Sequence, residues 1–186
     1  MEPGAVARAA RPGDICILLA SSRPVPARAR AMLDGLRQVH GGRIVEPLHV
    51  TVDRVATSET ERVVRAARAA LSRLRQAPVR VDRAFVIDSR DRGPHIVKLE
   101  VVRDSALVDD VAELRSALRE VGLPSLHGGD RLMTVSALEH AGPAREGANA
   151  WPGSTELFLG DLVIVSRIRG PASYEVLDTA TIAASR

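Results

Sequence analysis

The alternation of apolar and polar positions along the chain predicts a protein that mixes strands with helices. Apolar residues recur with a period of two in several short segments, which is typical of strands, and at helical spacing in others. Ser58 and Glu61 have the spacing of a capping box, and Asp104 or Ser105 can cap the last helix. We expect strands over 15–20, 48–52, 79–88, 96–102, 132–138, 155–168 and 174–182, and helices over 27–39, from 58 to just before Pro78, and from 105 to 121.

Turn residues predict how these segments connect. The third and fourth strands are expected to form one hairpin, and the last two strands a second one around Gly170. The glycine-, alanine- and proline-rich segment 140–154 is expected to be a long exposed loop. Residues 1–13 are expected to form a flexible tail, which leaves 14–186 as a single bilobal domain.

The order strand, helix, glycine turn, strand occurs twice, at a spacing of roughly eighty residues. The first copy runs from Ile17 to Val52 and the second from Lys98 to Leu138, and each has His-Gly-Gly before its last strand. This duplication predicts an α+β fold of two pseudo-symmetric lobes, each an antiparallel sheet with helices outside it, around a central cleft. Chance matching of short apolar runs is the alternative interpretation.

The strand over 48–52 carries the most informative polar residues. Alternation along it places His49 and Thr51 on one face and their apolar neighbours on the other. Histidine can transfer a proton near neutral pH, and a hydroxyl can donate a hydrogen bond to an oxyanion. The alternative is a histidine with a structural role on a half-buried strand.

The sequence Leu48-His49-Val50-Thr51-Val52 resembles one of the two His-x-Thr/Ser motifs of the 2H phosphoesterases, the family that includes the bacterial 2′-5′ RNA ligases, also called RNA 2′,3′-cyclic phosphodiesterases. The run over 156–177 is similar to the hairpin that closes the fold in that family, and the resemblance covers roughly residues 14–182. It implies metal-free chemistry in which one histidine is the general base and a second is the general acid, while each Thr or Ser donates to phosphate oxygens. His49 and Thr51 would then be the first catalytic pair.

The second copy of the motif lacks its histidine. It reads Arg131-Leu132-Met133-Thr134-Val135-Ser136. Either Leu132 or Thr134 stands where the family has histidine, and the sequence leaves both alignments open. In both of them Thr134 and Ser136 share one strand face. The resemblance therefore implies that these two residues bind phosphate, while one of the two acid–base groups is lost.

Three further residues are candidates for the cleft. His127 lies just before the second motif and can substitute for the missing histidine, and Arg54 continues the strand of His49 and can reach a phosphate. The resemblance implies a place for Tyr174 near the cleft as well. For each of them, a packing or surface role is the alternative. Weaker candidates are Arg131, Arg167, His95 and His140.

Composition narrows the function classes. The 186 residues are 45% hydrophobic with a formal net charge of only +3, so a nucleic-acid partner is permitted but not indicated. One tryptophan, one tyrosine and two phenylalanines are too few for a surface that stacks several bases. Lys98 is the only lysine, and the arginines suit phosphate, with arginine-rich codon usage as the alternative explanation. Cys16 is the only cysteine, which excludes a disulfide framework.

These observations predict a cytoplasmic α+β protein that acts on a phosphodiester or a 2′,3′-cyclic phosphate of a nucleotide or RNA end by metal-free histidine chemistry. The alternative is a catalytically impaired module of the same fold that binds a phosphorylated ligand, a nucleotide or a partner protein. We expect no cofactor and no metal, because no ligand cluster stands out. The apolar runs are too short for a membrane span, and no DNA-binding motif is present.

Overall fold

The computed structural model describes residues 10–89, 92–123, 125–127, 133–143, 153–170 and 173–184. Strands and helices are mixed along the chain, as the sequence predicts. In chain order the elements are β1 (Ile15–Ala20), α1 (Ala27–His40), β2 (Arg43–Ile44), β3 (His49–Val55), α2 (Thr60–Ala70), the 3₁₀ helix η1 (Leu71–Arg73), β4 (Ala77–Asp88), β5 (His95–Val101), α3 (Ser105–Glu120), β6 (Thr134–Ala141), β7 (Thr155–Gly160), β8 (Leu162–Gly170) and β9 (Ser173–Thr181).

The strands form one antiparallel sheet in the order β7-β4-β5-β6-β3-β1-β8-β9, with β2 paired to β6. In its middle, β3 and β6 pair only at Val50 and Val135 within the described part of the chain. This narrow junction divides the sheet into two lobes, one from β7 to β6 and the other from β3 to β9. The predicted two-lobed α+β fold is therefore confirmed.

The sequence repeat corresponds to a structural repeat about that junction. β1 and β3 are antiparallel neighbours joined through α1, and β5 and β6 are antiparallel neighbours joined through α3. The strand order β5-β6 on one side of the junction mirrors β3-β1 on the other. The Val50–Val135 pair consequently lies at the pseudo-two-fold axis that relates the two lobes.

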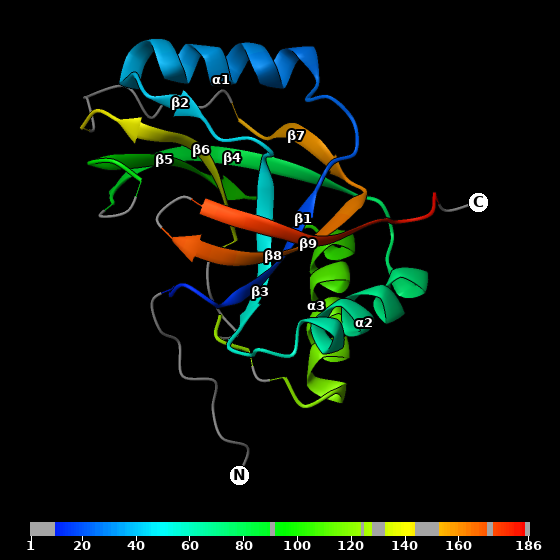
Figure 1. Cartoon of the computed structure of the whole chain (residues 1–186). Helices are drawn as coiled ribbons and strands as arrows, with labels where there is room; N and C mark the ends of the chain where they lie inside the picture. Colours follow the sequence, from blue (N-terminus) through cyan, green and yellow to red (C-terminus); the bar gives the residue numbers. More distant parts are fainter. Residues whose placement is uncertain are drawn as a thin grey trace.

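The helices cover one face of the sheet and leave the other face to the cleft. α1 contacts β2, β6 and β7, whereas α2 and α3 contact each other at the opposite end of the molecule, where α2 also contacts β1, β8 and β9 (Figure 1). The main core lies between helices and sheet, and its largest fully buried side chains include Leu33, Leu107, Leu114 and Leu118. On the other face a smaller apolar cluster contains Cys16, Leu18 and Ile164.

The expected strand over 155–168 is wrong, because two strands occupy it. β7 pairs with β4 in one lobe, and β8 pairs with β1 and β9 in the other. The chain changes lobe at Asp161, whose buried carboxylate accepts hydrogen bonds from the backbone N–H and the hydroxyl of Ser22 at 2.6 and 2.7 Å. Only the β8–β9 pair matches the expected closing hairpin.

The helix caps are partly as expected. Asp104 caps α3, since its carboxylate accepts from the N–H of Ala106 at 3.0 Å. The capping box at Ser58 is wrong: α2 begins at Thr60 without a side-chain cap, and the Thr57 hydroxyl accepts from the N–H of Glu59 instead. α2 also ends earlier than expected, at Ala70, where the chain tightens into η1.

Candidate functional site

Polar residues from both lobes surround a small cavity beside the pseudo-two-fold axis. The cavity has a volume of about 80 Å³. Its lining contains His49, Thr51, Lys98, Arg115, His127, Met133, Thr134 and Ser136. The four principal candidates from the two sequence motifs thus line one cavity, together with His127. Two charged residues, Lys98 and Arg115, join them without having been predicted.

His49 begins β3 and is fixed by one hydrogen bond. Its Nδ1 lies 2.8 Å from the carbonyl oxygen of Pro47. Because a carbonyl only accepts, Nδ1 carries the proton in this bond, and Nε2 of the neutral ring keeps its lone pair. Burial lowers the pKa of His49 from its ordinary 6.5, and the nearby Arg92 lowers it further, whereas the bond to Pro47 opposes the shift. His49 is therefore a neutral proton acceptor at neutral pH.

The pairing of Val50 with Val135 decides between the two alignments of the second motif. A two-fold axis at this pair relates His49 to Thr134, which are the residues just before Val50 and Val135. It likewise relates Thr51 to Ser136, the residues just after them. Thr134 therefore stands at the position of His49, and Ser136 at the position of Thr51. The other alignment would use Leu132, which lies outside the described residues.

The strands next to the motifs differ between the lobes. On β1, Ala20 and Leu18 pair with His49 and Thr51. On β5, the equivalent pairs join Glu100 to Thr134 and Lys98 to Ser136. We call His49 and Thr51 one half-site, and Thr134 and Ser136 the other. The half-site without a histidine is thus flanked by a carboxylate and an ammonium group, whereas the half-site of His49 is flanked by apolar side chains. Glu100 also forms an ion pair with Arg83 of β4.

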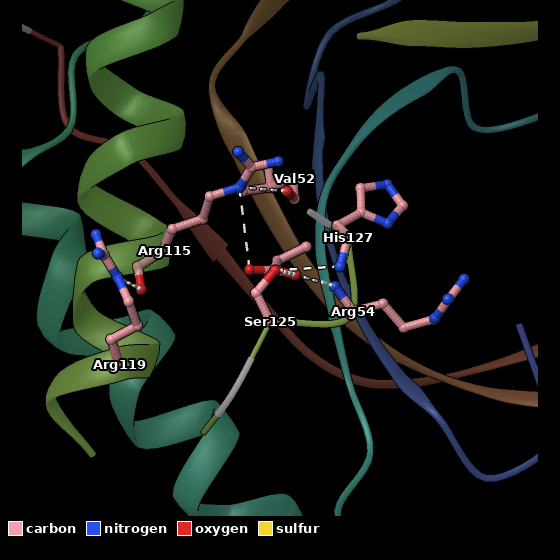
Figure 2. Close-up of polar contacts among 7 residues, drawn as sticks. Val52, Arg54, Arg115, Arg119, Ser125 and His127 are labelled. Carbon is pink, nitrogen blue, oxygen red and sulfur yellow. Dashed lines mark hydrogen bonds and ion pairs between the residues drawn. The ribbon is translucent and has the colours of Figure 1, made fainter. Parts of the chain in front are cut away.

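Hydrogen bonds hold His127 against β3. The N–H of Leu126 donates to the carbonyl of Arg54 at 2.8 Å, and the Ser125 hydroxyl donates to the Asp53 carboxylate at 2.7 Å. The N–H of His127 in turn donates to the Ser125 hydroxyl at 3.1 Å. Figure 2 shows this segment beside β3, with Ser125 and His127 close to Arg54. The imidazole of His127 is thereby held at the cavity wall.

Arg115 reaches the cavity from α3. Its Nε donates to the carbonyl of Val52 at 3.1 Å and lies 3.9 Å from the Asp53 carboxylate (Figure 2). Asp53 is buried, and this burial raises the pKa of its carboxyl group, although the hydrogen bond from Ser125 opposes the shift. Asp53 therefore organises two parts of the cavity wall, the His127 segment and Arg115. The signal for Arg115 is absent from the strand motifs, because it depends on how α3 packs.

A larger open pocket of about 630 Å³ adjoins the cavity and shares His49 with it. Tyr174 lines this pocket, as does Arg92, which donates to the Tyr174 hydroxyl and lies 5.5 Å from the centre of its ring. The floor is partly apolar, with Leu18 and Ile164. Further arginines on its wall are Arg30, Arg37 and Arg43.

Other candidates lie elsewhere. Arg54 is buried, with its Nε 3.4 Å from the Asp14 carboxylate, and lines neither the cavity nor the larger pocket. Arg167 donates to the Thr60 hydroxyl, and His95 lies 3.1 Å from Asp88. His140 is exposed. Arg131 and most of the expected 140–154 loop lie outside the described residues.

Neither a metal-ligand cluster nor a membrane-spanning helix is found among the described residues. No group of three or more His, Cys, Asp and Glu side chains within the described ranges could hold a metal ion. In the same part of the chain, none of the helices has the length and apolar character that a membrane crossing requires.

No family model matches the chain, and no curated protein matches it. Solved structures do. A phosphoesterase matches with a TM-score of 0.56 and 19% identity over 93% of this chain and 99% of its own. Escherichia coli LigT complexed with 3′-AMP matches with a TM-score of 0.53 and 19% identity over 94% and 99%. The Thermus thermophilus protein TT0787 matches with a TM-score of 0.57 and 18% identity over 93% of this chain and 100% of its own. The chain therefore has the fold of the LigT-like phosphoesterases, which confirms the resemblance to the 2H phosphoesterases at the level of the fold.

Proposed function

We propose that the protein is a 2H-type phosphodiesterase that hydrolyses a phosphodiester or 2′,3′-cyclic phosphate of a nucleotide or RNA end. One observation carries the proposal: His49 and the hydroxyls of Thr51, Thr134 and Ser136 line a single cavity in a LigT-like fold. The solved structures of LigT with 3′-AMP, NADP+, ATP and phosphate support a phosphorylated ligand.

The hydroxyl groups and His49 have separate tasks in this reaction. The hydroxyls of Thr51, Thr134 and Ser136 donate to the phosphoryl oxygens, which carry the charge that increases in the transition state. Nε2 of the neutral His49 accepts the proton of the attacking water, since Nδ1 is engaged with Pro47. No metal takes part in these steps.

The larger pocket beside His49 suits the remainder of a nucleotide. Arg30, Arg37 and Arg43 form ion pairs with Glu46, Asp34 and Glu139, and a further phosphate would compete with these carboxylates for the guanidinium groups. Tyr174 and the apolar floor can contact a base. The shared wall at His49 connects this pocket to the cavity where the phosphate would react.

A second candidate function is supported by a specific observation. Thr134 stands at the position that the two-fold axis relates to His49, and threonine cannot transfer a proton at neutral pH. The same cavity and pocket would then bind a phosphorylated ligand or nucleotide without hydrolysing it.

Hydrolysis in the presence of EDTA separates the two functions. Wild type and His49→Ala are compared on 2′,3′-cyclic nucleotides and on 2′-5′-linked dinucleotides. The control is Arg28→Lys, because Arg28 is exposed on α1 and lines neither the cavity nor the larger pocket. We expect turnover by wild type and the control, and a loss of about 10²- to 10⁴-fold in His49→Ala. Equal turnover in all three proteins would show that the site is wrong. No turnover in any of them, together with phosphate binding that depends on Ser136, would favour the binding function.

A further inference from the structure

The only lysine of the chain lines the candidate site. Among 26 lysine and arginine residues, every one except Lys98 is an arginine. The two side chains differ in a way that matters here, because a guanidinium does not release its proton in proteins whereas an ammonium group can. A lysine at this one position is therefore chemically distinct from all other cations of the protein.

The sheet places Lys98 and His49 on opposite sides of Ser136. Lys98 pairs with Ser136 across β5 and β6, and β3 with His49 lies on the other side of β6. Neighbouring strands are about 4.8 Å apart, so the backbones of β5 and β3 are separated by about 10 Å. A phosphate that accepts a hydrogen bond from Ser136 would have His49 on one side and Lys98 on the other.

We propose that Lys98 is the second proton-transfer group of the site and donates the proton to the departing oxygen. This inference rests on the proposed phosphodiesterase function. It assigns to the half-site around Thr134 the acid that its missing histidine would have provided. A lysine ammonium has three N–H donors and, unlike a guanidinium, can release a proton, which is what the role of an acid requires.

The reaction balances with these two groups. For a 2′,3′-cyclic phosphate, the oxygen of a water molecule bonds to phosphorus while the bond from phosphorus to one ribose oxygen breaks. His49 takes a proton from the water, and Lys98 gives a proton to the departing oxygen, which becomes a hydroxyl. His49 then releases its proton to solvent and Lys98 regains one, so the net change is the addition of one water molecule.

His127 is the competing candidate, and its segment is attached to the lobe that carries His49. The N–H of Leu126 donates to the carbonyl of Arg54 and the Ser125 hydroxyl donates to the Asp53 carboxylate, which attaches the segment to β3, the strand that carries His49. In-line displacement needs the acid and the base on opposite sides of the phosphorus atom. Lys98 belongs to the other lobe from His49, and it lies on a strand inside the sheet.

Several other charged or titratable groups lie near Lys98. Glu100 lies on the same strand face and pairs with Arg83 of β4, while Arg115 of α3 and the two histidines line the same cavity. The alkaline limb of a pH profile would therefore not report Lys98 alone. The dependence of the rate on the leaving group isolates the acid instead.

The test compares Lys98→Arg and Lys98→Met on two substrates. A 2′,3′-cyclic nucleotide expels an alkoxide that needs a proton, whereas bis(p-nitrophenyl) phosphate expels a stable phenolate that does not. We expect Lys98→Arg to lose about 10²-fold or more in kcat on the cyclic nucleotide, and to stay near wild type on the nitrophenyl ester. Arg28→Lys is the control for exchanging arginine and lysine at an exposed position. Thermal unfolding checks that each variant folds.

Each other outcome has a defined meaning. Wild-type rates in Lys98→Arg on both substrates, or an equal loss on both, would overturn the role as acid. A loss confined to the cyclic nucleotide in His127→Gln, and absent in Lys98→Arg, would assign the acid to His127. Inactivity of the wild type on both substrates would instead overturn the proposed function, and the role of Lys98 would fall with it.

A second measurement is independent of turnover. Reductive methylation with ¹³C-formaldehyde keeps the charge of the amine, and a chain with a single lysine gives a single side-chain signal in addition to the amino terminus. We expect inorganic phosphate to shift this Lys98 signal in wild type and much less in Ser136→Ala. A Lys98 signal that phosphate leaves unchanged would overturn contact between Lys98 and the phosphoryl group.

Discussion

The protonation of His49 follows from its immediate surroundings. Burial lowers its pKa below 6.5, and the positive charge of Arg92 acts in the same direction. The bond to Pro47 opposes this shift but also fixes the proton on Nδ1. A base with a lowered pKa remains available at a more acidic pH than an ordinary histidine.

We therefore expect kcat/KM to stay constant as the pH falls through 6.5 and to decline only at lower pH, where His49 becomes protonated. A pH–rate profile with a 2′,3′-cyclic nucleotide checks this, because kcat/KM reports groups of the free enzyme. Arg92→Met removes one cause of the shift and should move the decline to higher pH, whereas the exposed control Arg28→Met should not. A decline that begins above pH 6.5 would contradict a neutral His49.

The residues that the sequence identified share one property. His49, Thr51, Thr134 and Ser136 lie on strands, where the alternation of side chains is a local property that a single sequence reveals. Lys98 could be noticed only as an isolated lysine, since its place beside Ser136 depends on the register of β5 against β6. Strand register is set by tertiary packing, and for this reason the sequence could not assign it.

At the scale of elements, a buried carboxylate joins α3 to the segment after η1. Asp110 of α3 accepts a hydrogen bond from the N–H of Arg75 at 2.8 Å. Its other oxygen, Oδ2, is buried without a hydrogen-bond partner among the described residues. Burial consequently raises the pKa of Asp110 from 3.8 to about 6.

This shift makes the junction sensitive to pH. Between pH 3.8 and about 6, Asp110 is protonated in the folded protein and ionised in the unfolded chain. The contribution of Asp110 to the free energy of unfolding is therefore most favourable below pH 3.8, and it is lost as the pH rises through about 6. We expect Asp110→Asn, which keeps the acceptor but cannot titrate, to gain on the order of 2 kcal/mol over wild type between pH 4 and 7.

Urea unfolding of both proteins from pH 4 to pH 8 measures the difference. Asp109→Asn changes the neighbouring exposed carboxylate and should follow the pH dependence of wild type closely. A constant difference between wild type and Asp110→Asn over this range would show that Asp110 does not titrate there.

The boundaries of elements were harder to predict than their existence. β7 and β8 form a nearly continuous apolar stretch, so periodicity alone predicts one strand. The break at Asp161 arises because its carboxylate bonds Ser22, a residue far away in the sequence. A contact of that kind leaves no local signal.

At the scale of the whole molecule, the two lobes keep the same geometry and differ in chemistry. The Val50–Val135 pair relates equivalent positions on the two sides. One side has His49, Thr51, Leu18 and Ala20, and the other has Thr134, Ser136, Lys98 and Glu100. The symmetry of the fold thus provides equivalent places without dictating the residues that occupy them.

This symmetry predicts a rescue. If Thr134 occupies the position equivalent to His49, then a histidine there can provide the acid that Lys98 provides in wild type. We expect Thr134→His in a Lys98→Met background to recover at least about tenfold of the lost rate on the 2′,3′-cyclic nucleotide, because an imidazolium is a general acid near neutral pH. The rate on bis(p-nitrophenyl) phosphate should not increase.

Thr134→Gln in the same Lys98→Met background is the matched control, since glutamine is polar and similar in size to histidine but cannot transfer a proton. Recovery with histidine and none with glutamine requires that position 134 face the departing oxygen across the phosphate from His49. Equal rates for histidine and glutamine would mean that β6 does not present position 134 to the reacting phosphate. The equivalence of the two half-sites would then hold for the backbone of the sheet and not for its chemistry.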